Sequence, residues 1–163
     1  MLNIACVSPD GKPAAVEYNT KQIINSIKRF DEADIILFPR LSIPSASCGH
    51  MYRQPTLIKA CEKAANVIAK QVKNQYVIVG MPIILDCGSL IDVAAIMHNG
   101  KIISLVPLSD SKYPFDDFLE ETLWQGIKVS KNAHKLPNGK IFAIGSNCDN
   151  ADIILIPSNK AYI

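Results

Sequence analysis

The stretch "ADIILFPRLSIPS", residues 33–45, joins an apolar run to a proline and a cation. The run at residues 35–38 is typical of a buried strand of a parallel sheet, and Pro39 then interrupts the strand pattern. Arg40 follows directly. In α/β proteins the ends of such strands are where ligands bind. Arg40 is therefore the first candidate functional residue of the chain.

Strands and helices alternate around this stretch in the first half of the chain. The pattern predicts, in order, a strand at 2–7, a helix capped by Asn19 or Thr20 and ending near Phe30, a strand at 34–38, a loop at 41–54, a helix at 55–73, and a strand at 76–79 closed by Gly80. This order, β-α-β-α-β, indicates an α/β arrangement with parallel strands.

Turn signals dominate the second half. Asn99-Gly100 separates two β-rich runs, residues 90–98 and 101–106, and predicts a hairpin between them. Residues 107–126 show no period and are predicted to form a long loop. Asn138-Gly139 predicts a second hairpin leading into a strand at 140–144, and a last strand is predicted at 152–156. Because hairpins require antiparallel pairs, we expect a mixed sheet in one α/β domain, residues 1–163.

Composition excludes several classes of protein. The chain has 163 residues, of which 48% are hydrophobic and 20% charged, and its net charge is +2 with scattered lysines. We therefore expect a globular protein that binds neither nucleic acid nor membrane. Because residues 1–4 lack the features of a signal peptide, we expect a cytoplasmic location. The five cysteines are odd in number and widely spaced, and no histidine has a partner at ligand spacing, so no disulfide framework, metal or cofactor is expected.

Three predicted strand ends share a further pattern: "FPRL" at 38–41, "VPL" at 106–108 and "IGSNCD" at 144–149. Together with "VIVGMPI", "HNGKIISLVP", "YPFDDFLEE" and "ADIILIPSN", they occur in the order of the carbon–nitrogen hydrolase (nitrilase) superfamily. The chain resembles this superfamily throughout, and within it the glutaminase domains of glutamine-dependent NAD synthetases. The resemblance implies an α-β-β-α sandwich of mixed sheets with flanking helices, which we expect to be truncated at its C-terminus.

The resemblance also implies a site that this chain does not preserve. The family uses a glutamate base, a lysine that helps to hold the oxyanion, and a cysteine nucleophile, each just past a strand end. Arg40 stands at the position of the glutamate and Leu108 at that of the lysine. Either Asn147 or Cys148 stands at the position of the nucleophile, and the sequence leaves this open. A second glutamate of the family corresponds to Glu120.

These substitutions argue against amidase chemistry. Arginine cannot act as a base, and leucine offers no donor to an oxyanion. We therefore expect a protein that has lost amidase activity and acts, if at all, by binding to a second copy, to a related nitrilase-like chain, or to a small amide or anionic ligand. The alternative is an active amide or glutamine hydrolase with a rearranged site built on Cys148 and Glu120.

Arg40 itself has two interpretations. We expect its guanidinium to pair with a carboxylate from a neighbouring motif, with Glu120, Asp117 and Asp149 as candidates. The alternative is that Arg40 binds the carboxylate or phosphate of a ligand, which suits its planar fork of donors.

Overall fold

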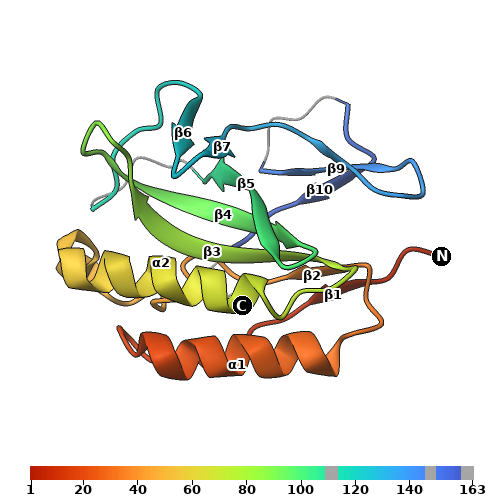
Figure 1. Cartoon of the computed structure of the whole chain (residues 1–163), viewed down its shortest axis with the longest axis horizontal. Helices are drawn as coiled ribbons and strands as arrows, with labels where there is room; N and C mark the ends of the chain where they lie inside the picture. The colour runs from red at the N-terminus through yellow and green to blue at the C-terminus, as the bar shows by residue number, and fades with distance from the viewer. Residues whose placement is uncertain (109–113, 146–149, 159–163) are drawn as a thin grey trace.

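The computed structural model describes residues 1–108, 114–145 and 150–158, which form three layers (Figure 1). Two helices, α1 and α2, cover one face of a seven-stranded sheet. A three-stranded sheet lies against the opposite face. These layers are three of the four in the nitrilase-like α-β-β-α sandwich predicted from the sequence, and the described residues contain no second layer of helices.

The elements follow the predicted order with different bounds. They are β1 (Ile4–Cys6), α1 (Val16–Arg29), β2 (Ile35–Leu37), a 3-10 helix (Gly49–Arg53), α2 (Pro55–Ala69), β3 (Tyr76–Ile84), β4 (Leu90–His98), β5 (Lys101–Pro107), β6 (Thr122–Trp124), β7 (Ile127–Val129), β8 (His134–Lys135), β9 (Ile141–Ile144) and β10 (Ile153–Leu155).

The large sheet has the strand order β1-β2-β3-β4-β5-β7-β6. Strands β1, β2 and β3 are parallel, whereas β4 pairs antiparallel with both β3 and β5. The small sheet has the order β10-β9-β8. Both predicted hairpins are confirmed, at Asn99-Gly100 between β4 and β5 and at Asn138-Gly139 between β8 and β9. The prediction of mixed pairing is therefore correct.

Helix α1 begins earlier than its sequence predicts. The helix starts at Val16, so Asn19 and Thr20 lie inside its first turns and do not cap it. Asn19 is 1% exposed, and its side-chain amide donates to the carbonyls of Lys12 and Ile43 while its oxygen accepts from the Lys12 amide. Asparagine is favoured as a cap because it bonds to nearby backbone, and here the same capacity joins two loops.

Two predictions differ from the observed strands. The strand predicted to close at Gly80 continues to Ile84 as β3, because Gly80 pairs with Ala94. Strand β6 lies inside the region predicted to be a loop, residues 107–126. Its turn to β7 uses Gln125 and Gly126, which both have positive φ, and a Gln-Gly pair is a weaker hairpin signal than Asn-Gly.

The large sheet is buried on both faces. On one face, side chains of α1 and α2 pack against residues such as Ile36, Val77 and Val93. On the other face, Ile35, Ile78 and Ile96 pack against residues of the small sheet such as Phe142 and Leu155. This two-sided burial explains why the central strands read as continuous apolar runs with no alternation.

The segment after β2 crosses β3 at Gly80. A Cβ atom at Gly80 would lie 2.6 Å from the Pro39 carbonyl oxygen and 2.7 Å from the Arg40 carbonyl carbon, and would also collide with the Leu41 nitrogen. Ile43 N donates to the Gly80 carbonyl at 3.2 Å, and Leu41 takes a positive φ of 52°. The missing side chain therefore lets the backbone that carries Arg40 lie directly on the sheet.

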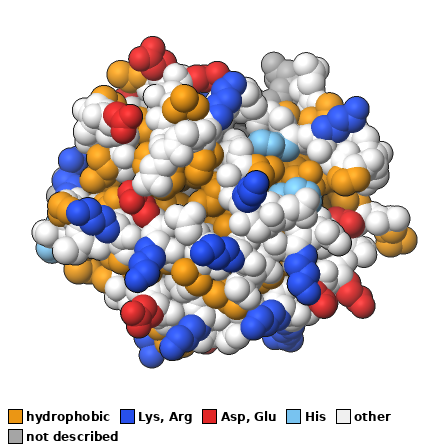
Figure 2. Space-filling model, viewed as in Figure 1, with side chains coloured by type: hydrophobic (Ala, Val, Ile, Leu, Met, Phe, Trp, Pro, Cys, Tyr) orange, Lys and Arg blue, Asp and Glu red, His pale blue; other side chains and the backbone are white. Residues whose placement is uncertain are grey.

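The distribution of charged side chains and the hydropathy of the helices are as expected for a globular protein. On the face drawn in Figure 2, lysine and arginine side chains are scattered among acidic and neutral ones and form no continuous stripe. Within the described ranges, no helix is long and apolar enough to cross a membrane.

We predict that Gly80→Ala destabilises the fold. The new methyl group meets backbone atoms that can move only together with the Arg40 segment, so we expect a loss of about 1–3 kcal/mol in the free energy of unfolding. Urea denaturation measures this loss. Gly11→Ala is the matched control, because its Cβ would make ordinary contacts of 3.6 Å, and its effect should stay within about 0.5 kcal/mol. Equal effects of the two substitutions would contradict the prediction.

Candidate functional site

Arg40 extends from the segment that crosses β3 at Gly80 toward β4 and β5. Its Nε donates to Oδ2 of Asp92, which lies on β4, at 2.8 Å. Its Nη2 donates to the carbonyl oxygen of Leu108, just past β5, at 3.1 Å. The guanidinium thus joins the strand end after β2 directly to the strand end after β5, the two positions that the sequence pattern singles out.

Asp92 projects from the face of β4 that carries Ala94 and Ile96, toward the small sheet. Its backbone carbonyl accepts a hydrogen bond from Leu108 N at 2.9 Å. Asp92 therefore contacts Leu108 through its backbone and Arg40 through its side chain. These three residues form one hydrogen-bonded unit, here called the Arg40–Asp92–Leu108 unit.

The ion pair of this unit is largely removed from water. The side chain of Asp92 is 2% exposed and that of Arg40 is 24% exposed. Burial raises the pKa of Asp92 to about 7, although the charge and the hydrogen bond of Arg40 act to lower it. Among the described residues, Oδ1 of Asp92 is buried and has no hydrogen-bond partner. An unsatisfied buried oxygen makes the ionised form costly, which accounts for the direction of the shift.

The third strand end, after β9, lies at the same edge of the molecule. Strands β9 and β10 run parallel, and Gly145 N, just past β9, donates to the carbonyl of Leu155 at the end of β10 at 3.0 Å. The residues that follow β10, 156–158, line a cavity of about 230 Å³ together with Leu37, Phe38 and Pro39 at the end of β2. The two candidate nucleophile positions, Asn147 and Cys148, lie outside the described residues.

The prediction that Arg40 pairs with a carboxylate is confirmed, but Asp92 was not among the predicted partners. Asp117 and Glu120 are both exposed, and Asp149 lies outside the described residues. The overlooked signal is the carboxylate inside the apolar strand "LIDVAAIM" at 90–97, because a charge in a buried run requires a partner.

Asp116, in the segment between β5 and β6, connects this segment to the rest of the fold through its carboxylate. Its Oδ2 accepts from Leu90 N at 2.8 Å, and its Oδ1 pairs with Arg53 at 3.3 Å. In the same segment, Phe115 packs against Tyr52 with ring centroids 5.2 Å apart. This part of the loop is therefore fastened to the start of β4 and to the 3-10 helix by Asp116 and Phe115.

The cysteines among the described residues divide into two kinds. Cys48 and Cys61 are buried, as expected of thiols that act as small apolar side chains, whereas Cys6 and Cys87 are exposed. Burial is the main reason that the pKa of Cys61 rises to about 12, so this thiol stays protonated at neutral pH. Within residues 1–108, 114–145 and 150–158, no cluster of three or more His, Cys, Asp or Glu is arranged to hold a metal ion.

Comparison with curated protein sequences finds similarity to glutamine-dependent NAD(+) synthetases. No family model matches the chain. It is 29% identical over 106 residues to a glutamine-dependent NAD(+) synthetase of Aquifex aeolicus (strain VF5), and 32% identical over 105 residues to one of Xanthomonas campestris pv. campestris (strain 8004). These alignments cover 64% and 62% of this chain but only 19% of each relative.

Solved structures extend the likeness to nearly the whole chain. A glutamine-dependent NAD(+) synthetase from Cytophaga hutchinsonii matches with a TM-score of 0.87 at 16% identity, over 98% of this chain and 30% of that one. An amidase from Nesterenkonia sp. AN1, which carries acrylamide on its active-site cysteine, matches with a TM-score of 0.75 at 14% identity, over 97% of this chain and 67% of that one. An amidase from Nesterenkonia AN1 is described as a member of the nitrilase superfamily. This chain has the nitrilase-superfamily fold.

The resemblance inferred from the sequence motifs is thus confirmed at the level of the fold. This nitrilase-like chain spans 30% of the Cytophaga hutchinsonii synthetase and 33% of a second one, from Acinetobacter baumannii, which it matches with a TM-score of 0.81.

We predict that Asp92 makes the stability of the nitrilase-like chain depend on pH. Between about pH 4 and pH 7 the folded protein holds a proton on Asp92 that the unfolded chain has released, so the folded state binds more protons. Its stability relative to Asp92→Asn should therefore fall as the pH rises through this range, by at most roughly 1.4 kcal/mol per pH unit, and level off above about pH 8.

Urea denaturation of both proteins at several pH values measures this difference. Asp86→Asn, at an exposed aspartate, serves as the control and should give a difference that changes little with pH. A difference between wild type and Asp92→Asn that grows with pH would mean that Arg40 outweighs burial, contrary to the prediction.

Proposed function

We propose that this nitrilase-like chain is a glutaminase-like domain that lacks amidase activity and acts by binding. The observation that carries the proposal is the Arg40–Asp92–Leu108 unit. Arg40 takes the position that the family resemblance gives to the glutamate base, and its guanidinium is bonded to Asp92 and to the Leu108 carbonyl. A charge-inverted residue fixed in this way supports a structural role in place of the base.

The oxyanion partner is also lost under this proposal. At the position that the resemblance gives to a lysine, Leu108 has an apolar side chain, and its carbonyl accepts from Arg40. Loss of one oxyanion donor alone typically lowers the rate about 100- to 1000-fold. Without a base, a thiol of ordinary pKa is only a few per cent thiolate at neutral pH. Together these losses leave little of the family's chemistry.

Asp92 does not replace the missing base under this proposal. A general base must come within hydrogen-bond reach of the proton it removes. Oδ2 of Asp92 is bonded to Arg40, and Oδ1 has less than 1 Å² of accessible surface. Its pKa of about 7 would suit a base, but neither oxygen is open to a substrate. We therefore assign Asp92 to the ion pair.

A binding role is supported by apolar side chains at two strand edges. Strand β1 lies at the edge of the large sheet and β10 at the edge of the small sheet. Ile4 is 39% exposed, Ile154 is 48% exposed and Ile156 is 61% exposed. Apolar strand edges invite pairing with another chain. We propose that a second copy, or a related nitrilase-like chain, covers this surface.

We predict that the purified chain releases no ammonia from L-glutamine or acetamide above the level of a blank. The measurement is a coupled ammonia assay at pH 6–9, with an active nitrilase-superfamily amidase on acetamide as the positive control. Ammonia release that disappears in Cys148→Ala would contradict the proposal and would establish the alternative, a hydrolase with a rearranged site built on Cys148.

We also predict self-association that depends on the apolar edges. Sedimentation velocity at increasing protein concentration should show a species heavier than the monomer. Ile154→Glu should shift the distribution toward the monomer, because it places a charge on the surface to be buried. Val67→Glu, at a residue that is 42% exposed on helix α2 and away from any strand edge, is the matched control and should leave the distribution unchanged. A monomer at all concentrations would count against a second copy as the partner.

A further inference from the structure

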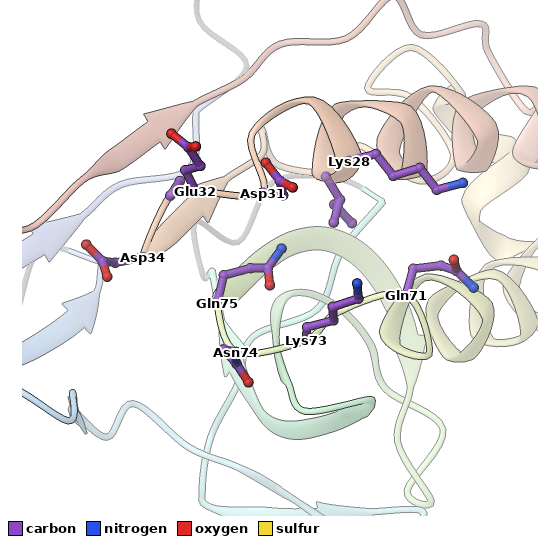
Figure 3. A pocket seen from close by; sticks show the side chains of 10 residues that line it. Lys28, Asp31, Glu32, Asp34, Gln71, Lys73, Asn74 and Gln75 are labelled. Carbon is purple, nitrogen blue, oxygen red and sulfur yellow. The ribbon is translucent and has the colours of Figure 1, made fainter.

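A cavity of about 380 Å³ lies at the end of the large sheet opposite Arg40 (Figure 3). Its walls are the segment that joins α1 to β2 and the segment that joins α2 to β3. Asp34 and Gln75, which line it, come directly before β2 and β3, whereas Arg40 comes after β2. The cavity is therefore separate from the Arg40–Asp92–Leu108 unit, and its size falls within the range of small-molecule sites.

Gln75 is a buried polar side chain that faces this cavity. The residue is only 7% exposed, and Figure 3 shows its side chain extending from the start of β3 into the cavity. Its backbone carbonyl lies 3.1 Å from Nδ1 of His98, but its side-chain amide makes no hydrogen bond to any other residue in the described part of the chain. The amide opens into the cavity, so a polar group bound there can supply the partner that the described residues do not.

Opposite charges line the cavity without being paired to each other. Asp31 is on the α1–β2 segment and Lys73 is on the α2–β3 segment, and both line the cavity with Gln75 (Figure 3). Among the described residues, no ion pair joins Asp31 to Lys73. The two charges thus offer separate contacts, one for a cation and one for an anion, with the Gln75 amide in the same cavity.

The surroundings favour an ammonium group on the side of Asp31. Glu32 and Asp34 add negative charge to the same wall. The last turn of α1 contributes Ile27 and the cation Lys28, whose single charge is outnumbered on this wall by the three carboxylates. The carboxyl end of a helix also carries a partial negative charge that favours cations. Ile27 and Ala33 provide a small apolar surface in the cavity.

We propose that this cavity binds a small zwitterion of the α-amino-acid class. The ligand ammonium contacts Asp31, its carboxylate contacts Lys73 and the Gln75 amide, and a short apolar side chain lies against Ile27 and Ala33. A ligand of this kind satisfies both charges and the buried amide at once. The site does not depend on whether the chain has amidase activity, because none of these residues contacts the Arg40–Asp92–Leu108 unit.

The test uses the full chain and three matched probes in isothermal titration calorimetry. L-Norvaline carries both charges, butylamine lacks the carboxylate, and valerate lacks the ammonium. We expect L-norvaline to bind and each single-charge analogue to bind at least about tenfold more weakly, since each lacks one charge-assisted contact. Butylamine or valerate binding as tightly as L-norvaline would overturn the assignment to zwitterions, and absence of L-norvaline binding would overturn the site.

Variants then locate the binding. Asp31→Asn and Lys73→Met should each weaken L-norvaline binding at least about tenfold, because each removes one charged contact. Asp10→Asn and Lys21→Met, at exposed residues outside the cavity, are the matched controls and should leave it unchanged. Equal binding by Asp31→Asn and Asp10→Asn would overturn the proposal. Binding lost in Arg40→Met but kept in Asp31→Asn would place the ligand at the other end of the sheet, which also overturns it.

Discussion

The close contact between Gly80 and the backbone of residues 39–41 is the constraint on which the site depends. A side chain at Gly80 would collide with this backbone, and only its absence lets the segment after β2 lie across β3. From there the Arg40 side chain reaches Asp92 on β4 and the carbonyl of Leu108. Leu41 takes a positive φ of 52° in the same turn, a conformation that is uncommon for leucine. The sheet therefore fixes the direction of Arg40 before any side-chain contact is made.

The ion pair that results differs in kind from a catalytic pair. A base and an oxyanion donor must each keep an open position for the substrate, whereas Arg40 is bonded to Oδ2 of Asp92 and to the Leu108 carbonyl. Burial of Asp92 is costly, as its raised pKa indicates, and the pair offsets part of that cost. Under the proposed function, this ion pair keeps charged groups at the strand ends of a nitrilase-like sheet in place of the arrangement that would cleave amides.

Sequence patterns predict the fold of this chain better than its site. Apolar runs and Asn-Gly turns are local signals, so the central strands and both hairpins follow from them. The start of α1 does not follow from a local signal, because Asn19 donates its side-chain hydrogen bonds to loop carbonyls and does not cap the helix. Position in the motif "FPRL" identifies Arg40, but its partner lies on a strand 52 residues away. The Gln75 cavity has no sequence motif at all, since two separate loops form it.

The order of strands in the large sheet also bears on how the chain folds. Strands β1 to β5 are neighbours in space in the order in which they occur along the chain. Among these strands, only the β3–β4 and β4–β5 hairpins close short loops, whereas pairing β1 with β2 and β2 with β3 closes connections that each contain a helix and costs more entropy. The Arg40–Asp92 ion pair joins these two parts, because it links the segment after β2 to a hairpin strand 52 residues away. Its net effect is to close a long loop between the helix-connected strands and the hairpin strands.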